Sequence, residues 1–90
     1  MNPYIEYEDN HLVAHRIFKH TVEDLELVWH RDRENRHVTV IEGEGWMFQQ
    51  ENKLPIELHP GDQIYIPKRT YHRIIKGSTD LKIRIQKEFN

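Results

Sequence analysis

The chain has 90 residues, of which 37% are hydrophobic and 31% charged, and its formal net charge at pH 7 is −2. This length suits one domain with a modest core, and the balanced charge leaves no basic field for nucleic acid or an anionic membrane surface. The sequence has no cysteine, no run near the roughly 20 apolar residues of a membrane span and no signal-peptide pattern, so we expect a single cytoplasmic domain over residues 1–90.

The first third of the chain predicts strands and one ambiguous segment. Apolar residues alternate over 4–8 and 12–19, on either side of a turn at 9–10. Residues 21–24 resemble a helical capping box, and the spacing after them would allow a short helix. Residues 30–37 contain no apolar side chain, however, so a longer helix would lose its core face. We therefore predict a turn at 21–24 and a strand over 25–30.

The rest of the chain predicts further short strands separated by turns. The turns lie at 43–45, 51–53, 59–62 and 77–80, and the strand over 81–86 has the clearest alternation. The apolar positions that alternate in the shorter strands are Val38, Val40, Trp46, Phe48, Ile56, Leu58, Ile64 and Ile66. Short strands at a spacing of roughly 8–12 residues indicate an all-β sandwich or barrel.

The polar run 30–37 is the first candidate site. Alternate residues of an extended chain share a face. One face of this run therefore combines one imidazole, two carboxylates and a guanidinium, from His30, Asp32, Glu34 and Arg36. Such a set could hold a ligand, although the same alternation also fits a solvated strand with surface salt bridges.

The second candidate site runs from Gly61 to His72. Gly61 begins a predicted turn, Pro67 ends the following strand because it has no N–H to donate, and His72 opens the next strand. Tyr71, beside His72, is the best aromatic candidate for lining a pocket, and Trp46 is the second. Aromatic residues at strand spacing equally fit a core or a dimer interface.

Together these two segments resemble the cupin superfamily over about residues 25–85. Gly61, Pro67 and His72 occupy the glycine, proline and histidine positions of the second cupin motif, with Arg69 in place of its inner glycine. The first cupin motif has two histidines two residues apart, a glutamate four residues later and then a glycine.

Aligned on Gly43, the first motif departs from that pattern. His30 and Asp32 fall at the two histidine positions, and Arg36 falls at the glutamate position. The resemblance implies a cupin-like β-barrel, or jelly roll, of two facing antiparallel sheets. It also implies a divalent Fe, Mn, Ni or Zn held by His30, Asp32 and His72, a set with two histidines and one carboxylate.

Arg36 leaves a metal-free alternative open, since an arginine cannot bind a metal. It could pair with Asp32 or Glu34 and leave a polar pocket, or it could receive an anionic ligand with its forked guanidinium. On the second interpretation Arg36 binds the ligand, with Tyr71, Trp46 and Glu34 as further ligand-binding candidates. The resemblance also implies a homodimer in which the strands within residues 1–20 complete the sheet of a partner.

Three functions follow, all with a small molecule as the partner. The first is a small metal-binding cupin that acts on or binds an anionic or oxygen-bearing molecule. The second is a metal-free ligand-binding module with no catalysis. The third is sugar-phosphate isomerase-like activity, because the stretch Trp29-His30-Arg31 with the acid-rich run after it faintly resembles the cupin domain of those enzymes. Whether the protein is an enzyme stays open.

Overall fold

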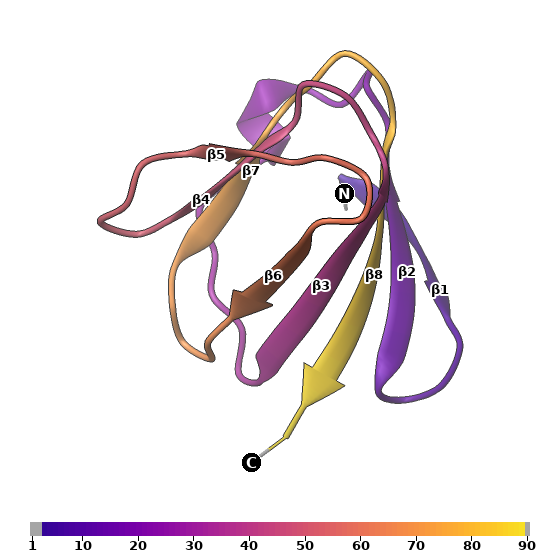
Figure 1. The fold of residues 1–90 in the computed structure, drawn as a ribbon, viewed down its shortest axis with the longest axis vertical. Coiled ribbons are helices and arrows are strands. Elements are labelled where there is room, and N and C mark those ends of the chain that lie inside the picture. Colours follow the sequence, from indigo (N-terminus) through magenta and orange to yellow (C-terminus); the bar gives the residue numbers. More distant parts are fainter. Residues whose placement is uncertain (1–2, 90) are drawn as a thin grey trace.

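The computed structural model of the protein describes residues 3–89, which form two antiparallel β-sheets that face each other (Figure 1). One sheet has five strands in the order β1-β2-β8-β3-β6, and the other has three in the order β5-β4-β7. The strands are β1 (Tyr4–Glu8), β2 (Val13–Phe18), β3 (Asn35–Glu42), β4 (Met47–Gln50), β5 (Ile56–Glu57), β6 (Gln63–Ile66), β7 (His72–Ile75) and β8 (Leu81–Glu88). The predicted all-β architecture of two facing sheets is confirmed.

Strand β8 organises the larger sheet, because it pairs with β2 on one side and with β3 on the other. Its inward residues Leu81, Ile83 and Ile85 are buried, and the residues between them are more exposed, as the alternation predicts. Burying one such side chain contributes about 1.5–3 kcal/mol.

Trp46 is the most deeply buried large residue of the core, with 0% of its surface exposed. Its indole N–H donates a hydrogen bond of 2.6 Å to the carbonyl of Thr79, so the buried polar group is satisfied. The chain at Gly77 passes directly against Trp46 and the carbonyl of Glu44, where a Cβ atom would collide with both. Only glycine fits this crossing.

The turn before β6 has the predicted geometry. Gly61 has a φ of 93°, in the region that L-residues rarely adopt, and its N–H donates to the carbonyl of Val40 at 2.8 Å. Strand β6 ends at Ile66, directly before Pro67, and β7 begins at His72.

The predicted strand over 25–30 is wrong. A 3₁₀ turn, η1 (Asp24–Glu26), stands there instead, with a capping box between Glu23 and Glu26. Leu25 is 90% exposed and Val28 is 60% exposed, and of the apolar residues in this segment Leu27 packs against the core. Within residues 3–89 we find no helix with the length and apolar character needed to cross a membrane.

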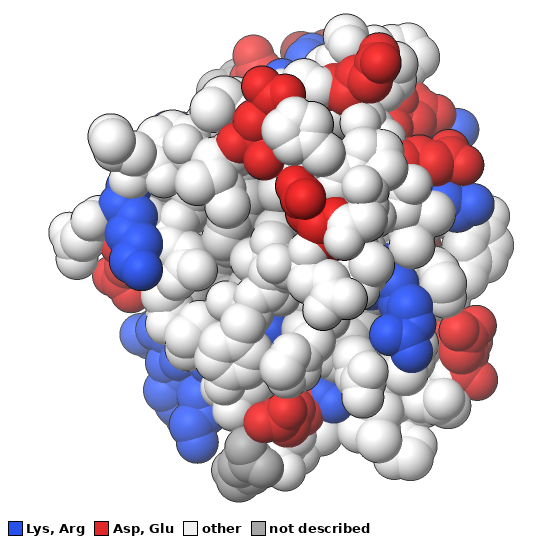
Figure 2. Space-filling model, viewed as in Figure 1, with Lys and Arg blue, Asp and Glu red and all other residues white. Residues whose placement is uncertain are grey.

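Charged residues of both signs are scattered over the face shown in Figure 2, with mostly uncharged atoms between them. No single sign of charge covers this face, in agreement with the formal net charge of −2.

Candidate metal centre

The fold brings His30 and His72 side by side. The N–H of His30 donates to the carbonyl of His72 at 3.0 Å, and the N–H of His72 donates to the carbonyl of His30 at 2.8 Å. This antiparallel bridge joins the segment before β3 to the first residue of β7. The two imidazole rings lie 4.3 Å apart between centroids and meet edge to face.

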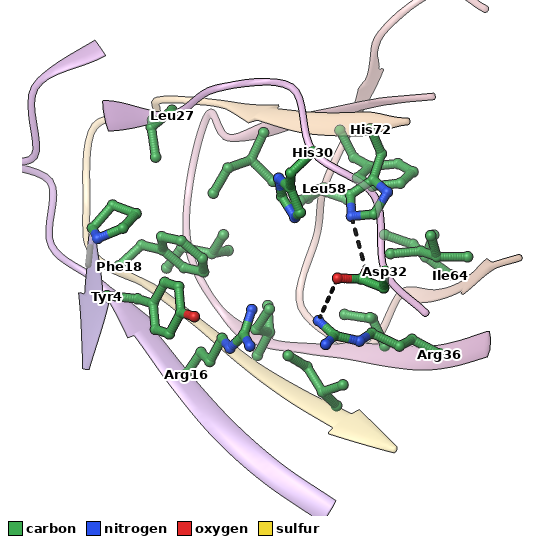
Figure 3. A pocket seen from close by; sticks show the side chains of 18 of the residues that line it. Tyr4, Arg16, Phe18, Leu27, His30, Asp32, Arg36, Leu58, Ile64 and His72 are labelled. Atoms are coloured by element: carbon green, nitrogen blue, oxygen red, sulfur yellow. Dashed lines mark ion pairs between the residues drawn. The ribbon is translucent and has the colours of Figure 1, made fainter. Parts of the chain in front are cut away.

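Asp32 extends from the same segment toward these rings (Figure 3). Its Oδ2 lies 3.4 Å from Nε2 of His72. One nitrogen of each imidazole and one carboxylate oxygen all lie within 4.8 Å of one another. The carbonyl of Asp32 accepts a hydrogen bond of 2.7 Å from the N–H of Arg69, which ties the loop after β6 to the loop that carries the carboxylate.

Backbone carbonyls favour one tautomer of each ring. Nδ1 of His72 lies 2.9 Å from the carbonyl oxygen of Thr70, and Nδ1 of His30 lies 3.2 Å from that of Val28. A carbonyl can only accept, so Nδ1 carries the proton and Nε2 of the neutral ring keeps its lone pair. Histidines that bind metals are oriented by this kind of second hydrogen bond.

One ligand atom of this group has no hydrogen-bond partner among the described residues. This atom is Oδ2 of Asp32, which is buried. A carboxylate oxygen and the Nε2 of a neutral imidazole both accept, so their approach calls for a proton or a cation between them. Bonds of about 2.1 Å to one metal place ligand atoms about 3.0–3.4 Å apart at octahedral or tetrahedral angles, so atoms that now lie within 4.8 Å of one another would move closer by up to about 1.8 Å. The residues fit a divalent transition metal with open positions.

The electrostatic surroundings favour the protonation states that bind a metal. Burial lowers the pKa of His30 below its ordinary value, although the hydrogen bond with Val28 opposes this. Burial alone would raise the pKa of Asp32, but His72 and the Arg36 guanidinium outweigh it and hold that pKa below its usual value. At neutral pH Asp32 is therefore ionised and His30 neutral, as metal binding requires.

Arg36, the second residue of β3, lies beside this group. Its terminal nitrogens are 3.4 Å from Oδ1 of Asp32 and 3.6 Å from Oε1 of Glu34, and all three side chains are about nine-tenths buried. These are long contacts, and Nε of Arg36 has no hydrogen-bond partner among the described residues. The ion pairs foreseen for Arg36 are present, and most of its donors stay available to a ligand.

The site opens into a cavity of about 370 Å³ between the inner faces of the two sheets (Figure 3). This volume lies at the lower end of the range of small-molecule sites. His30, Asp32, Arg36 and His72 line one part of the cavity, and most of the remaining wall is apolar. The apolar lining includes Phe18, Phe48, Leu58, Ile66, Ile83 and Ile85.

Two of the sequence-predicted ligand-binding residues lie elsewhere. Trp46 is enclosed in the core, and Tyr71 is 41% exposed with the guanidinium of Arg31 at 5.1 Å from its ring. Neither is among the described residues that line the cavity. Glu34 reaches the site only through its contact with Arg36.

Sequence reasoning missed Arg16 of β2, which lines the cavity together with Tyr4 of β1. A signal was present, because Arg16 stands between Ala14 and Phe18 on the face of β2 that turns inward. A cation at an inward position of an otherwise apolar face is unusual and indicates a specific role.

No known protein family and no curated protein matches this sequence. Solved structures do match in fold. An RmlC-like cupin family protein with a double-stranded β-helix fold, from Methanocaldococcus jannaschii, has a TM-score of 0.73 at 18% identity, over 97% of this chain and 81% of that one. A chain from the structures of the DMSP lyases RdDddP and RnDddQII has a TM-score of 0.74 at 16% identity, over 86% of this chain and 37% of that one. The structure of FeII HppE has a TM-score of 0.68 at 16% identity, over 84% of this chain and 41% of that one.

Proposed function

Given that the chain has the cupin fold, we propose that it is a small metal-binding cupin that acts on or binds a small anionic or oxygen-bearing molecule. One observation carries the proposal: His30, Asp32 and His72 each direct a possible ligand atom to one place, within 4.8 Å of one another, and the Oδ2 atom of Asp32 is buried with no hydrogen-bond partner among the described residues. The fold neighbours, which include DMSP lyases and an iron(II) form of HppE, add that this fold accommodates small-molecule and metal chemistry.

The side chains of the site would have three different roles: metal binding, ligand orientation and exclusion of water. His30, Asp32 and His72 would hold Fe(II), Mn(II), Ni(II) or Zn(II), which when bound polarises an oxygen of the ligand as a Lewis acid. Arg36 would orient an oxygen or anionic group beside the metal with the guanidinium donors that it does not use internally. The apolar wall would exclude water from the ligand and strengthen these polar contacts.

Metal binding is tested by metal analysis of protein purified without an affinity tag, followed by equilibrium dialysis against Zn(II) or Mn(II). We expect about one equivalent per chain in the native protein and under a tenth of that in His72→Ala and Asp32→Asn. His59→Ala is the matched control, because His59 is exposed and pairs with Glu57 at the surface. Metal content that is low in the native protein and unchanged in His72→Ala would contradict the proposal.

A metal-free binding module is the second candidate, because Arg36 already contacts Asp32 and Glu34. A ligand of such a module would raise the unfolding temperature equally with and without a chelator. A ligand of the metal centre would lose its effect when EDTA is added. Thermal-shift measurements with a panel of small carboxylates and phosphates, each with and without EDTA, separate the two candidates.

The sequence-based expectation of a cytoplasmic homodimer belongs to the same proposal. Strand β1 lies at one edge of the five-stranded sheet, and its outward residues Ile5 and Tyr7 are 45% and 58% exposed. An exposed edge strand with apolar side chains is a surface on which a second copy could pair.

A further inference from the structure

A second cation faces the cavity from the N-terminal strands. The side chain of Arg16 is only 12% exposed, and its guanidinium lies 4.0 Å from the centre of the Tyr4 ring. Figure 3 shows this guanidinium directed into the cavity, on the opposite side from the imidazoles of His30 and His72. The cavity therefore has a polar group at each of two separated positions.

The ion pair of Arg16 with Glu6 leaves most of its donors unused. The two residues lie directly opposite each other in the β1–β2 register, and Nε of Arg16 donates to Oε1 of Glu6. This bond occupies the inner nitrogen of the guanidinium. The four remaining N–H donors, on the two terminal nitrogens, make no hydrogen bond to a described residue.

A purely structural pair would not need the inward position. A cross-strand ion pair stabilises a sheet equally well on its outer face, where desolvation costs little, whereas burying charges carries a penalty of several kcal/mol per ion. The inward placement leaves a preorganised fork of donors inside an apolar cavity, the arrangement that suits a carboxylate.

We propose that the cavity takes a short aliphatic carboxylate, with its carboxylate on the terminal nitrogens of Arg16 and its hydrocarbon part along the apolar wall. The inference rests on the proposed function only for the far end of the ligand, which lies toward His30, Asp32 and His72. The contact with Arg16 itself needs no metal. The apolar wall selects a hydrocarbon body over a sugar, whose hydroxyl groups would lose their hydrogen bonds to water there.

The test compares carboxylates with their neutral amides. Butanoate, hexanoate and octanoate, and the three corresponding amides, are titrated calorimetrically into native protein, once after dialysis against EDTA and once with one equivalent of Zn(II). We expect at least one carboxylate to bind metal-free native protein about tenfold or more tightly than its amide, as charge-assisted hydrogen bonds predict. If no carboxylate is preferred over its amide, the inference is wrong, and this comparison needs no variant.

Two substitutions on the same ion pair identify the contact. Arg16→Gln should remove the tenfold preference, and Arg16→Lys, which keeps the charge without the fork, should reduce it. Glu6→Gln breaks the same pair but frees the guanidinium, so it should retain or increase the preference. A preference that survives in Arg16→Gln, or that is lost in folded Glu6→Gln, overturns the inference.

The comparison of titrations with and without Zn(II) keeps this inference distinct from the proposed function. A preference that requires Zn(II) and is unaffected by Arg16→Gln would place the carboxylate on the metal, which supports the proposed function and overturns the contact with Arg16. An Arg16-dependent preference in a protein that binds no metal would leave this inference standing and remove the proposed metal centre.

Discussion

Arg69 stands where the resemblance would place a glycine, and its backbone shows why glycine suits the position. Its φ is 61°, in the left-handed region, while its N–H donates to the carbonyl of Asp32. An L-residue in this conformation costs about 1–2 kcal/mol. The hydrogen bond involves only the backbone and holds the loop that carries Asp32, so the conformation serves the site whatever side chain is present.

Arg69→Gly should therefore stabilise the protein. Relief of the left-handed strain outweighs the entropy that a glycine loses on folding, about 0.5–1 kcal/mol, so we expect a net gain of about 0.5–1 kcal/mol. Urea unfolding of metal-free protein measures it. Lys68→Gly is the control, since its φ is not positive and the substitution should cost stability. A loss of stability in Arg69→Gly would show that the Arg69 side chain contributes more than its backbone strain costs.

Acidification should weaken the fold through His30. Its pKa in the folded protein is lowered from 6.5 by burial, so the unfolded chain binds a proton more readily than the folded one. Stability consequently falls as the pH drops below about 6.5 toward the folded pKa. The lowered pKa of Asp32 acts in the same direction at lower pH: its stabilisation is present above 3.8 and is lost as the pH falls through the folded pKa.

Thermal unfolding between pH 7.5 and 5.0, in the presence of EDTA, measures this dependence. We expect the unfolding temperature to decrease with pH, and His30→Gln to flatten part of the decrease. His11→Gln serves as control because His11 is exposed. An identical pH dependence in native protein and His30→Gln would contradict the assignment.

At the level of elements, the turn between β5 and β6 sets the position of β6. Two hydrogen bonds join His59 and Asp62 across this turn. The N–H of His59 donates to Oδ2 of Asp62 at 2.8 Å, and the N–H of Asp62 donates to the carbonyl of His59 at 2.9 Å. Gly61, between them, has a φ of 93°, and a Cβ atom there would meet nothing within 4 Å. Only the backbone conformation, and not crowding, requires glycine.

Gly61→Val should cost about 1–2 kcal/mol through this conformation alone. Gly61→Asn is the matched variant, because asparagine tolerates positive φ better, and it should cost less than valine. Equilibrium unfolding in urea compares the two. Equal effects of valine and asparagine would mean that the turn relaxes to another conformation, and a neutral valine would contradict the requirement for positive φ.

The segment between η1 and β3 shows where element prediction failed. Alternation of apolar residues over 25–30 predicts a strand, but Leu25, Val28 and Trp29 are all exposed and only His30 pairs with another chain segment. The sequence pattern reports a local periodicity and contains no information on whether a core is available for those side chains. At this position the chain forms a 3₁₀ turn, and of its apolar side chains Leu27 packs against the core.

At the scale of the whole molecule, the expected dimer makes a simple prediction. Sedimentation equilibrium should give a mass of about 22 kDa, twice the 11.0 kDa of the chain. Ile5→Lys, on the edge strand β1, should shift the protein toward the monomer by placing a charge in the interface. Tyr65→Lys is the matched control on β6, at the opposite edge of the same sheet. A native mass of 11 kDa would refute the dimer.

Much of the site was predictable because it depends on local geometry. The alternation predicted that His30, Asp32 and Arg36 would lie together, and all three line the same cavity, although the chain bends at 33–34 and Glu34 does not line it. The second motif was equally clear, with a turn at Gly61, a strand end before Pro67 and a strand start at His72. None of these features depends on which residues lie on the opposite sheet.

The sequence by itself determined most of the strands, the turns and the face that each side chain of an extended run shares with its neighbours. Only the tertiary structure decided that Trp46 belongs to the core, that Tyr71 lies outside the cavity and that Arg16 lies inside it. The physical reason is that periodicity is set by bonds between adjacent residues. The cavity, in contrast, exists only once two sheets built from distant segments close around it.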